Sequence, residues 1–296
     1  MKYHHPIRRR LRQARRYAQA AAVPGVFRQG LVIPAHWWDG HPNFGDDLTP
    51  WLLPRYGFVP VYRRARDAQL IGVGSILEFV PEDFEGAIWG SGLIREVARP
   101  LPRAHVLAVR GALTRDLIGA PASTPLGDPG LLVALHIPRP KTRWRVGVVP
   151  HGHHVSHVGL RTAISEAGAG VHVIDVHRSA AQVVREIAAC EMIVTTSLHG
   201  LVTADSYGVP AVWTTLDPPL EGGDFKFRDY ESAVTPGVSR RAALHVGGTL
   251  AGLTRWARTP DPDVVSRLTI DLQGGLARLP GILVGSKRYP FLAATT

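Results

Sequence analysis

The sequence predicts an α/β protein made of two Rossmann-like domains that face a central cleft. Short apolar runs typical of buried strands alternate with segments of helical periodicity. This order indicates parallel βαβ units. The alternation occurs in two series, separated by the proline-rich, basic stretch 137–143 (IPRPKTR). Several predicted strands run directly into glycine, serine or histidine. Polar groups are therefore expected at the carboxyl ends of the strands, where α/β sheets bind ligands.

The first series predicts an N-terminal Rossmann-like domain over residues 30–136. We expect a helix that opens at Asp46 and Asp47, whose carboxylates suit the helix dipole, and that ends or bends at Pro54. A second helix is expected over 112–118. The expected strands are 31–33, 69–73, 87–89 and 105–109.

The second series predicts a C-terminal Rossmann-like domain over residues 144–242. We expect helices over 160–167, 180–189 and 201–208, and strands over 146–149, 171–176, 192–194 and 209–213. Residues 225–229 are interpreted as a polar, aromatic loop. Residues 1–29 are a basic N-terminal segment, and 243–296 are a C-terminal segment with helical periodicity. Two such halves around a cleft have the glycosyltransferase-B-like architecture, with the ligand between the domains.

The composition is that of a soluble globular protein, with 296 residues of which 45% are hydrophobic and 20% charged. The chain has no run of eighteen apolar residues and no secretory signal, so we expect no membrane span and a cytoplasmic location. The single cysteine, Cys190, excludes an internal disulfide. Its apolar, helical surroundings predict a packed thiol rather than a nucleophile.

The net charge of +10 is concentrated at the amino terminus, where eight basic residues and no acidic residue precede Asp39. Three interpretations stay open. The segment is a solvated, poorly ordered tail, a contact to anionic lipid at the inner face of the plasma membrane, or a nonspecific nucleic-acid contact. No nucleic-acid-binding module accompanies the charge, so no specific nucleic-acid partner is predicted.

The stretch 195–200 (TTSLHG) places a hydroxyl and an imidazole where a predicted strand becomes a helix. Because a helix N-terminus attracts anions, we expect an anion site formed by Ser197, His199 and the amides of Gly200 and Leu201. Arg110 follows the strand 105–109 and is expected to clamp a carboxylate or phosphate of the ligand. The structural alternatives are a surface arginine and a histidine that caps the helix.

A histidine-rich loop follows the strand 146–149, with His151 and His153 as expected contacts to a phosphate or a sugar. An exposed polar loop and a zinc site are the alternatives, but no cysteine or carboxylate completes a zinc spacing, and no metal is predicted. Trp37, Trp38 and Trp51 either stack on sugar rings or pack in the core. A dinucleotide site after the strand 69–73 is set aside, because the glycine pattern is incomplete.

Five motifs occur in order between about residues 43 and 231: NFGDDL at 43–48, the glycine turns GVGS at 72–75 and WGSG at 89–92, VRG at 109–111 with LGDP at 126–129, SLHG at 197–200 with GVP at 208–210, and FKFRDY at 225–230. Together they resemble the polysaccharide pyruvyl transferase family. Some members carry an arginine just before the histidine of the fourth motif, where this chain has Thr196 and Ser197. Another residue must then hold the donor.

The resemblance implies transfer of a pyruvyl group from phosphoenolpyruvate to a sugar of an exopolysaccharide or cell-wall repeat unit, forming a ketal across two hydroxyls. The acceptor is then a saccharide, which in the family is often lipid-diphosphate-linked, and no cofactor is needed. His199 would bind the donor or act as the acid, and Asp46 or Asp47 would take the sugar's proton. The alternative for both carboxylates is a helix cap. The other expected substrate contacts are Asn43, Gly74, Ser75, Ser91, Lys226 and Arg228.

Two other functions remain open from the sequence. One is a glycosyltransferase that uses a nucleotide-sugar donor on the same architecture. The other is a noncatalytic protein that binds nucleic acid or a membrane surface through its basic segment.

Overall fold

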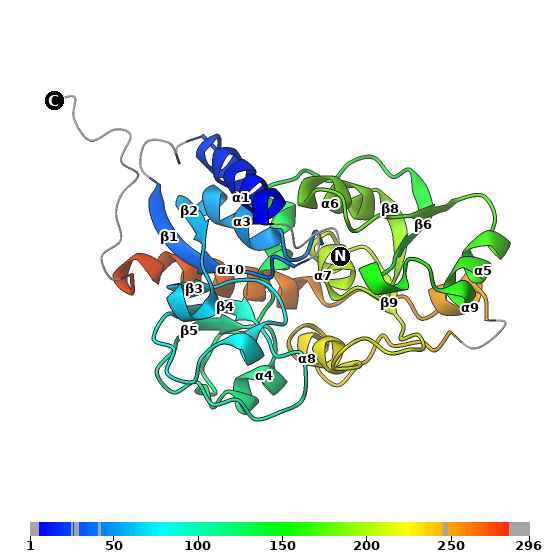
Figure 1. Cartoon of the computed structure of the whole chain (residues 1–296). Coiled ribbons are helices and arrows are strands. Elements are labelled where there is room, and N and C mark those ends of the chain that lie inside the picture. Colours follow the sequence, from blue (N-terminus) through cyan, green and yellow to red (C-terminus); the bar gives the residue numbers. More distant parts are fainter. Residues whose placement is uncertain (1–5, 25, 27–29, 41–42, 245–247, 284–296) are drawn as a thin grey trace.

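The structure is a computed structural model that describes residues 6–24, 26, 30–40, 43–244 and 248–283. It contains two sheets side by side, the first with strand order β2-β1-β3-β4-β5 and the second with order β7-β6-β8-β9 (Figure 1). Neighbouring strands are parallel in both sheets. The predicted α/β class with two parallel halves is confirmed.

The first sheet contains four strands that the sequence predicted and one that it did not. The predicted strands are β1 (Leu31–His36), β3 (Leu70–Ile71), β4 (Ala87–Ser91) and β5 (His105–Val109). The additional strand, β2 (Phe58–Tyr62), contains Pro60 and pairs only with β1, at the edge of the sheet. Proline lacks the N–H that a central strand needs but is tolerated at an edge.

The helices of the first half follow the sequence prediction closely. Helix α3 (Leu48–Leu52) starts directly after Asp47 and passes into a 3₁₀ turn, Leu53–Tyr56, which contains Pro54. Helix α4 (Ala112–Leu117) follows β5, and a 3₁₀ segment, Pro129–Leu135, ends this half.

The second half also follows the predicted order. Its strands are β6 (Trp144–Val149), β7 (Val171–Val173), β8 (Cys190–Thr195) and β9 (Ala211–Trp213), of which β7 and β9 are shorter than expected. Its helices are α5 (Val158–Glu166), α6 (Ala180–Ala188) and α7 (Leu198–Ser206).

Cys190 is the first residue of strand β8, so its predicted helical setting is wrong, but its packed state is confirmed. The thiol is buried, and its Sγ lies 3.2 Å from the carbonyl oxygen of Glu186. Burial raises the pKa of the Cys190 thiol to about 12. The sulfur is therefore protonated and unreactive at physiological pH.

The predicted loop at 225–229 is wrong, because these residues begin helix α8 (Phe225–Val234). The charged side chains suggested a solvated segment, yet Lys226 and Asp229 are buried together with the aromatic residues of the helix. Phe227 stacks on Trp213 of β9, with ring centroids 4.4 Å apart. Because Lys226 and Asp229 are charged, the sequence shows no continuous apolar face at helical spacing, although both residues are buried in α8.

The C-terminal segment contains helices α9 (Leu250–Thr254) and α10 (Pro262–Ala277). Helix α10 returns to the first sheet (Figure 1), where Trp89 Nε1 donates a 2.9 Å hydrogen bond to the carbonyl oxygen of Leu272. The last described helix therefore packs on the first half of the chain.

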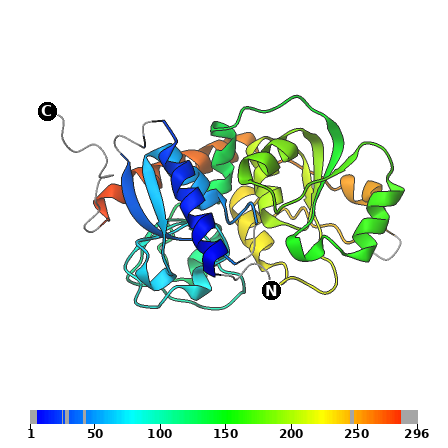
Figure 2. The ribbon, with the colours of Figure 1, turned by 45° about the horizontal axis from the view of Figure 1, so that its top comes forward.

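Helix α1 (Pro6–Ala21) forms most of the basic N-terminal segment and crosses in front of the first sheet (Figure 2). The interpretation of residues 6–21 as a poorly ordered tail is wrong. Arg12 Nε and Arg16 donate to the buried carboxylate of Asp39 at 2.9 and 2.7 Å, and Arg16 also pairs with Asp47. Two of the arginines thus hold α1 against the loop that follows β1.

A buried ion-pair network joins α7, α8 and the segment that follows α8. Arg240 donates to both carboxylate oxygens of Asp205, at 2.6 and 3.0 Å, and lies 3.3 Å from Glu231. Tyr230 also donates to Asp205 at 2.9 Å. Because removing one partner of a buried pair leaves an unpaired charge, this network is expected to matter for stability.

We expect Arg240→Ala to lower the free energy of unfolding by about 3–5 kcal/mol, since Asp205 and Glu231 would stay buried without their cation. The neighbouring Arg241→Ala is the matched control, because its side chain is half exposed and its pair with Asp224 is 3.5 Å long. It should cost at most about 1 kcal/mol. Urea unfolding measures both. Equal effects of the two substitutions would contradict a structural role specific to Arg240.

Candidate active site

A cavity of about 600 Å³ lies between the two halves of the chain, where the carboxyl ends of strands from both sheets meet. Its lining residues follow β1, β3, β4, β6, β7, β8 and β9, with Lys226 added from α8. This is the position at which open α/β sheets bind ligands. Eight of the fourteen predicted site residues line it: Asn43, Asp46, Ser75, His151, His153, Ser197, His199 and Lys226.

His199 stands in the first turn of α7 with a side chain that is 9% exposed. The edge of its ring packs against Phe44, with centroids 6.2 Å apart. A Cβ on Gly45 would lie 2.0 Å from the Nδ1 of His199, so only glycine allows the loop to approach the imidazole. The first and fourth sequence motifs therefore meet at this ring.

Asp128 is a site residue that the sequence prediction missed, although its motif was noted. Its buried carboxylate accepts a 2.8 Å hydrogen bond from the amide of Gly130 through Oδ1. The other oxygen, Oδ2, lies 3.6 Å from Nε2 of His199. Among the described residues neither of these two buried atoms has a hydrogen-bond partner. A small approach would pair them, and the carboxylate would then orient the imidazole.

Asp46 and Asp47 have different surroundings. Asp46 lines the cavity, and burial raises its pKa to about 7, against the opposing effect of the His199 charge. A carboxyl group that titrates near neutrality suits general acid–base chemistry. Asp47 pairs with Arg16 and does not line the cavity. It occupies the N-cap position of α3, as the alternative interpretation expected, but its side chain makes no capping bond there.

Lys226 contributes a buried cation to the cavity. Its side chain belongs to a residue only 8% exposed, and in the ranges that the structure describes no carboxylate forms an ion pair with it. Burial, followed by the charge of Arg110, lowers the pKa of Lys226 to about 8. An ammonium group without a protein counterion is suited to bind an anionic ligand.

The N-terminus of α7 offers two backbone donors at the same cavity. The predicted donors, Gly200 and Leu201, are wrong because both amides donate to the carbonyl oxygen of Ser197, at 3.1 and 3.3 Å. In the described part of the chain, the amides of Leu198 and His199 have no acceptor. These are the first orphan N–H groups of the helix, so the free donors lie two residues earlier than predicted.

Gly200 instead serves packing. A Cβ there would lie 2.5 Å from Oγ1 of Thr195. The hydroxyl of Ser197 makes no capping bond to the helix and belongs to the cavity lining.

Arg110 is fully buried and does not line the cavity. Its Nε donates to Asp229 at 2.8 Å, one terminal nitrogen donates to the carbonyl oxygen of Leu93 at 2.6 Å, and the other donates to Ser75. Arg110 was predicted to clamp the ligand, but all three nitrogens of its guanidinium donate hydrogen bonds within the protein. Arg110 reaches the cavity only through its hydrogen bond to Ser75, which does line it.

Three further predicted contacts lie outside the lining. Ser91 is buried and donates to the carbonyl oxygens of Gly72 and Gly74, at 2.6 and 3.0 Å, so it shapes the glycine turn. Gly74 adopts φ +130°, a conformation that favours glycine. Arg228 is exposed and pairs with Glu96 and Asp224.

His151 and His153 line the cavity, as predicted. Burial, followed by the charge of Lys226, lowers the pKa of His151 to about 3, so this imidazole is neutral at physiological pH. His157 has a structural role, since its Nδ1 accepts from the amide of Leu160 at the start of α5. The described residues contain no cluster of three or more histidine, cysteine or carboxylate groups that could hold a metal ion.

Comparison with known proteins matches residues 31–218 to the model of the family named polysaccharide pyruvyl transferase. The chain belongs to this family. It is also 30% identical, over 259 residues, to the succinoglycan biosynthesis protein ExoV of Rhizobium meliloti (strain 1021), covering 80% of this chain and 78% of that protein. An uncharacterized protein, L143, of Acanthamoeba polyphaga mimivirus is 31% identical over 157 residues, covering 49% and 53% of the two chains.

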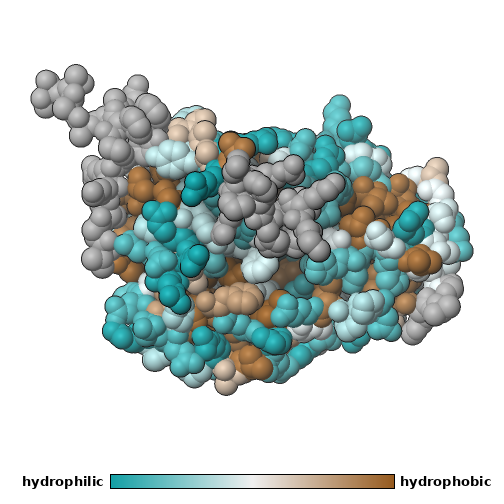
Figure 3. All heavy atoms as spheres, in the orientation of Figure 1, coloured by the Kyte–Doolittle hydropathy of each residue, from teal (hydrophilic) through white to brown (hydrophobic). Residues whose placement is uncertain are grey.

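Among the residues that the structure describes, no helix of this family member is long and apolar enough to cross a bilayer. The face seen in Figure 3 is mostly hydrophilic, with hydrophobic residues gathered in separate patches.

We expect Asp46→Asn to stabilise the protein at pH 8 by about 1–3 kcal/mol, an amount reduced because Asp46 is partly open to the cavity. Folding raises the pKa of Asp46 from 3.8 to about 7, so its charged form costs the folded state free energy. This cost grows as the pH rises through that window and stays constant above it.

The difference in unfolding free energy between Asp46→Asn and the wild type should therefore shrink toward zero near pH 4. Urea unfolding at pH 4.5, 6 and 8 measures it. Asp83→Asn, at an exposed position, is the control and should change the unfolding free energy by less than about 0.5 kcal/mol at each pH. A difference for Asp46→Asn that does not vary with pH would disprove the burial of a titrating carboxyl.

Proposed function

We propose that this protein transfers the pyruvyl group of phosphoenolpyruvate to a saccharide and forms a ketal. The observation that carries the proposal is the buried ammonium of Lys226, which has no ion-pair partner among the described residues and shares one cavity with the α7 N-terminus, His199 and Asp46. Phosphoenolpyruvate carries a carboxylate and a phosphate on three carbons, and a site for it needs several donors of positive or partial positive charge within a small volume.

In this proposal Lys226 takes the place of the arginine that some family members carry before the motif histidine. This chain has Thr196 and Ser197 there, and the cation comes from α8 instead. The amides of Leu198 and His199 and the hydroxyls of Ser197 and Ser75 would complete the set of donors. A lysine binds phosphate as a point charge, which suits a site where backbone amides set the direction.

The proposed chemistry begins when the imidazolium of His199 gives a proton to the methylene carbon of phosphoenolpyruvate. The neighbouring carbon becomes oxocarbenium-like, and the first sugar hydroxyl attacks it and passes its proton to Asp46. Phosphate then leaves with the electrons of its C–O bond and takes that proton. The second hydroxyl closes the ketal ring and returns a proton to His199, so both groups end as they began.

The proposed acceptor is a saccharide of an exopolysaccharide, because the relative ExoV is named for succinoglycan biosynthesis. The proposal places it between two glycosyltransferase-B-like domains. A lipid-diphosphate-linked acceptor at the inner membrane face would also suit α1, whose outer side exposes Arg10, Leu11 and Arg15. Basic residues near an anionic membrane contribute about 1 kcal/mol each to binding.

We expect Lys226→Met to weaken phosphoenolpyruvate binding about 10–100-fold, the loss typical of a charge-assisted contact. Titration calorimetry at pH 7 measures the dissociation constant. Wild-type affinity should also fall as the pH rises through about 8, where Lys226 loses its proton.

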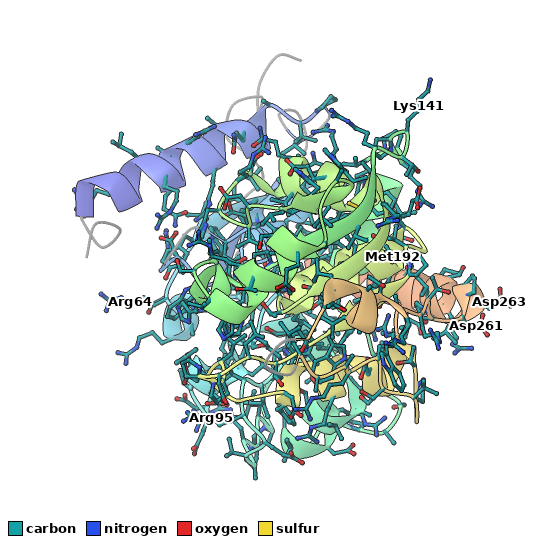
Figure 4. The ribbon with its side chains drawn as sticks, turned by 90° about the vertical axis from the view of Figure 1, so that its right-hand side faces the viewer. Arg64, Arg95, Lys141, Met192, Asp261 and Asp263 are labelled. Carbon is teal, nitrogen blue, oxygen red and sulfur yellow. The ribbon has the colours of Figure 1, made fainter. Side chains whose placement is uncertain are left out.

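Lys141→Met is the matched control, since Lys141 is exposed between the two halves and points outward in Figure 4. It should bind phosphoenolpyruvate as the wild type does. If the wild type does not bind phosphoenolpyruvate but binds a nucleotide-sugar saturably, the proposed pyruvyl transfer is wrong and glycosyl transfer becomes the proposed function.

Asp128→Asn should lower kcat about 10–100-fold and leave KM for phosphoenolpyruvate within about threefold. Asparagine keeps the oxygen that accepts from Gly130 but cannot hold the imidazolium of His199 by charge. Phosphate release in the presence of a saccharide acceptor measures the rate. Asp263→Asn, at an exposed position that Figure 4 labels, is the control. A rise in KM alone would assign Asp128 to donor binding.

A further inference from the structure

The cavity has an apolar side that the donor chemistry does not use. Trp38, Ile76, Phe79 and Ile94 come from the first half, and Leu220 comes from the second. The groups assigned to phosphoenolpyruvate lie at the start of α7, on α8 and on the glycine turn. A carboxylate and a phosphate gain nothing from an apolar wall, so this side is suited to a different part of the reaction.

Two aromatic rings of this wall are open. Trp38 is 41% exposed and Phe79 is 50% exposed, and their ring centroids lie 5.9 Å apart at an interplanar angle of 32°. Neighbouring aromatic rings that stay partly uncovered lose the free energy that burial would supply. At the edge of a binding cavity, such a pair is available to a ligand.

Of Trp37, Trp38 and Trp51, only Trp38 presents an open ring to the cavity. Trp37 is buried in the core, and its ring packs edge-on against Tyr62 at 5.2 Å. Trp51 is covered by the guanidinium of Arg55, 3.5 Å from its ring centroid. Neither lines the cavity.

The backbone holds Trp38 in its place. The indole lies against Gly40, where an added Cβ would come within 2.7 Å of three of its atoms, so an alanine there would displace the ring. The indole of Trp38 is therefore in contact with its own loop on one side and with Phe79 on another. A fixed aromatic ring loses little conformational entropy when a ligand binds it.

We propose that Trp38 and Phe79 form the acceptor subsite and bind the C–H face of a hexopyranose ring. This inference rests on the proposed function and names the substrate that the apolar wall receives. A pyranose has an apolar face of ring C–H groups and an edge of hydroxyls. With its face on the two rings, its hydroxyls face the polar side of the cavity, which contains Asp46 and His199.

Saturation-transfer NMR tests the subsite on the full chain. The probes are methyl hexopyranosides and oligosaccharides released from succinoglycan by hydrolysis. In the wild type, the strongest transfer is expected on ring C–H protons of one face of a bound hexose. Trp38→Ala should weaken saccharide binding at least tenfold, whereas Trp38→Phe should restore it to within about threefold of the wild type.

Two further variants serve as comparisons. Gly40→Ala keeps the indole but displaces it, and should weaken saccharide binding as Trp38→Ala does. Trp256→Ala removes a tryptophan that is 55% exposed outside this cavity and should bind saccharide as the wild type does. Circular dichroism and thermal unfolding establish that each variant is folded.

Phosphoenolpyruvate calorimetry separates this inference from the proposed function. All four variants should bind phosphoenolpyruvate within twofold of the wild type. Unchanged saccharide binding by Trp38→Ala overturns the subsite, and so does an equal loss of both ligands. If the wild type binds saccharide through Trp38 but does not bind phosphoenolpyruvate, the subsite stands and the donor assignment fails.

Discussion

The buried ion pair between Arg110 and Asp229 determines where the cation of the site lies. Asp229 also accepts from the amide and the hydroxyl of Thr114, both at 2.7 Å, so one carboxylate ties α8 to the start of α4. A Cβ on Gly111 would lie 1.7 Å from the carbonyl oxygen of Asp229. Helix α8 belongs to the second half of the chain but is fixed to the first half at this point. Because Lys226 is one turn away on α8, its position in the cavity depends on this pair.

The same arrangement costs stability. Lys226 is buried, and its pKa falls chiefly for that reason and further because of the charge of Arg110, whose own ion pair is with Asp229. Asp46 has a raised pKa for the corresponding reason, since its charge is poorly solvated. Groups of this kind weaken folding and persist where a ligand or a proton transfer requires them. An anionic donor would stabilise the buried ammonium of Lys226 by supplying the counterion that the described residues lack.

The sequence predicted the strands and helices that depend on neighbouring residues. It failed to predict side-chain contacts between residues that are far apart in the chain. Apolar runs located eight of the nine named strands, and β2 was missed because Pro60 is unusual in a strand. His199 and Asp46 were found because each stands at a strand-to-helix junction. Arg110 was expected in the cleft because its partner, Asp229, is 119 residues away and was itself placed in a loop. The role of Asp128 required knowing that its motif meets α7.

The basic segment shows why net charge alone does not reveal a function. Its charge indicated a surface for anions, yet Arg12 and Arg16 point inward and bind Asp39, and Arg16 also binds Asp47. These two carboxylates lie on either side of the residues that carry Asn43, Gly45 and Asp46. Gly45 in turn lies against His199 of the second half. The loop after β1 is therefore held by α1 on one side and by the imidazole on the other. Trp38 and Asp46 both come from this loop. Helix α1 therefore supports the aromatic wall and the titrating carboxyl together, although Arg12 and Arg16 do not line the cavity themselves.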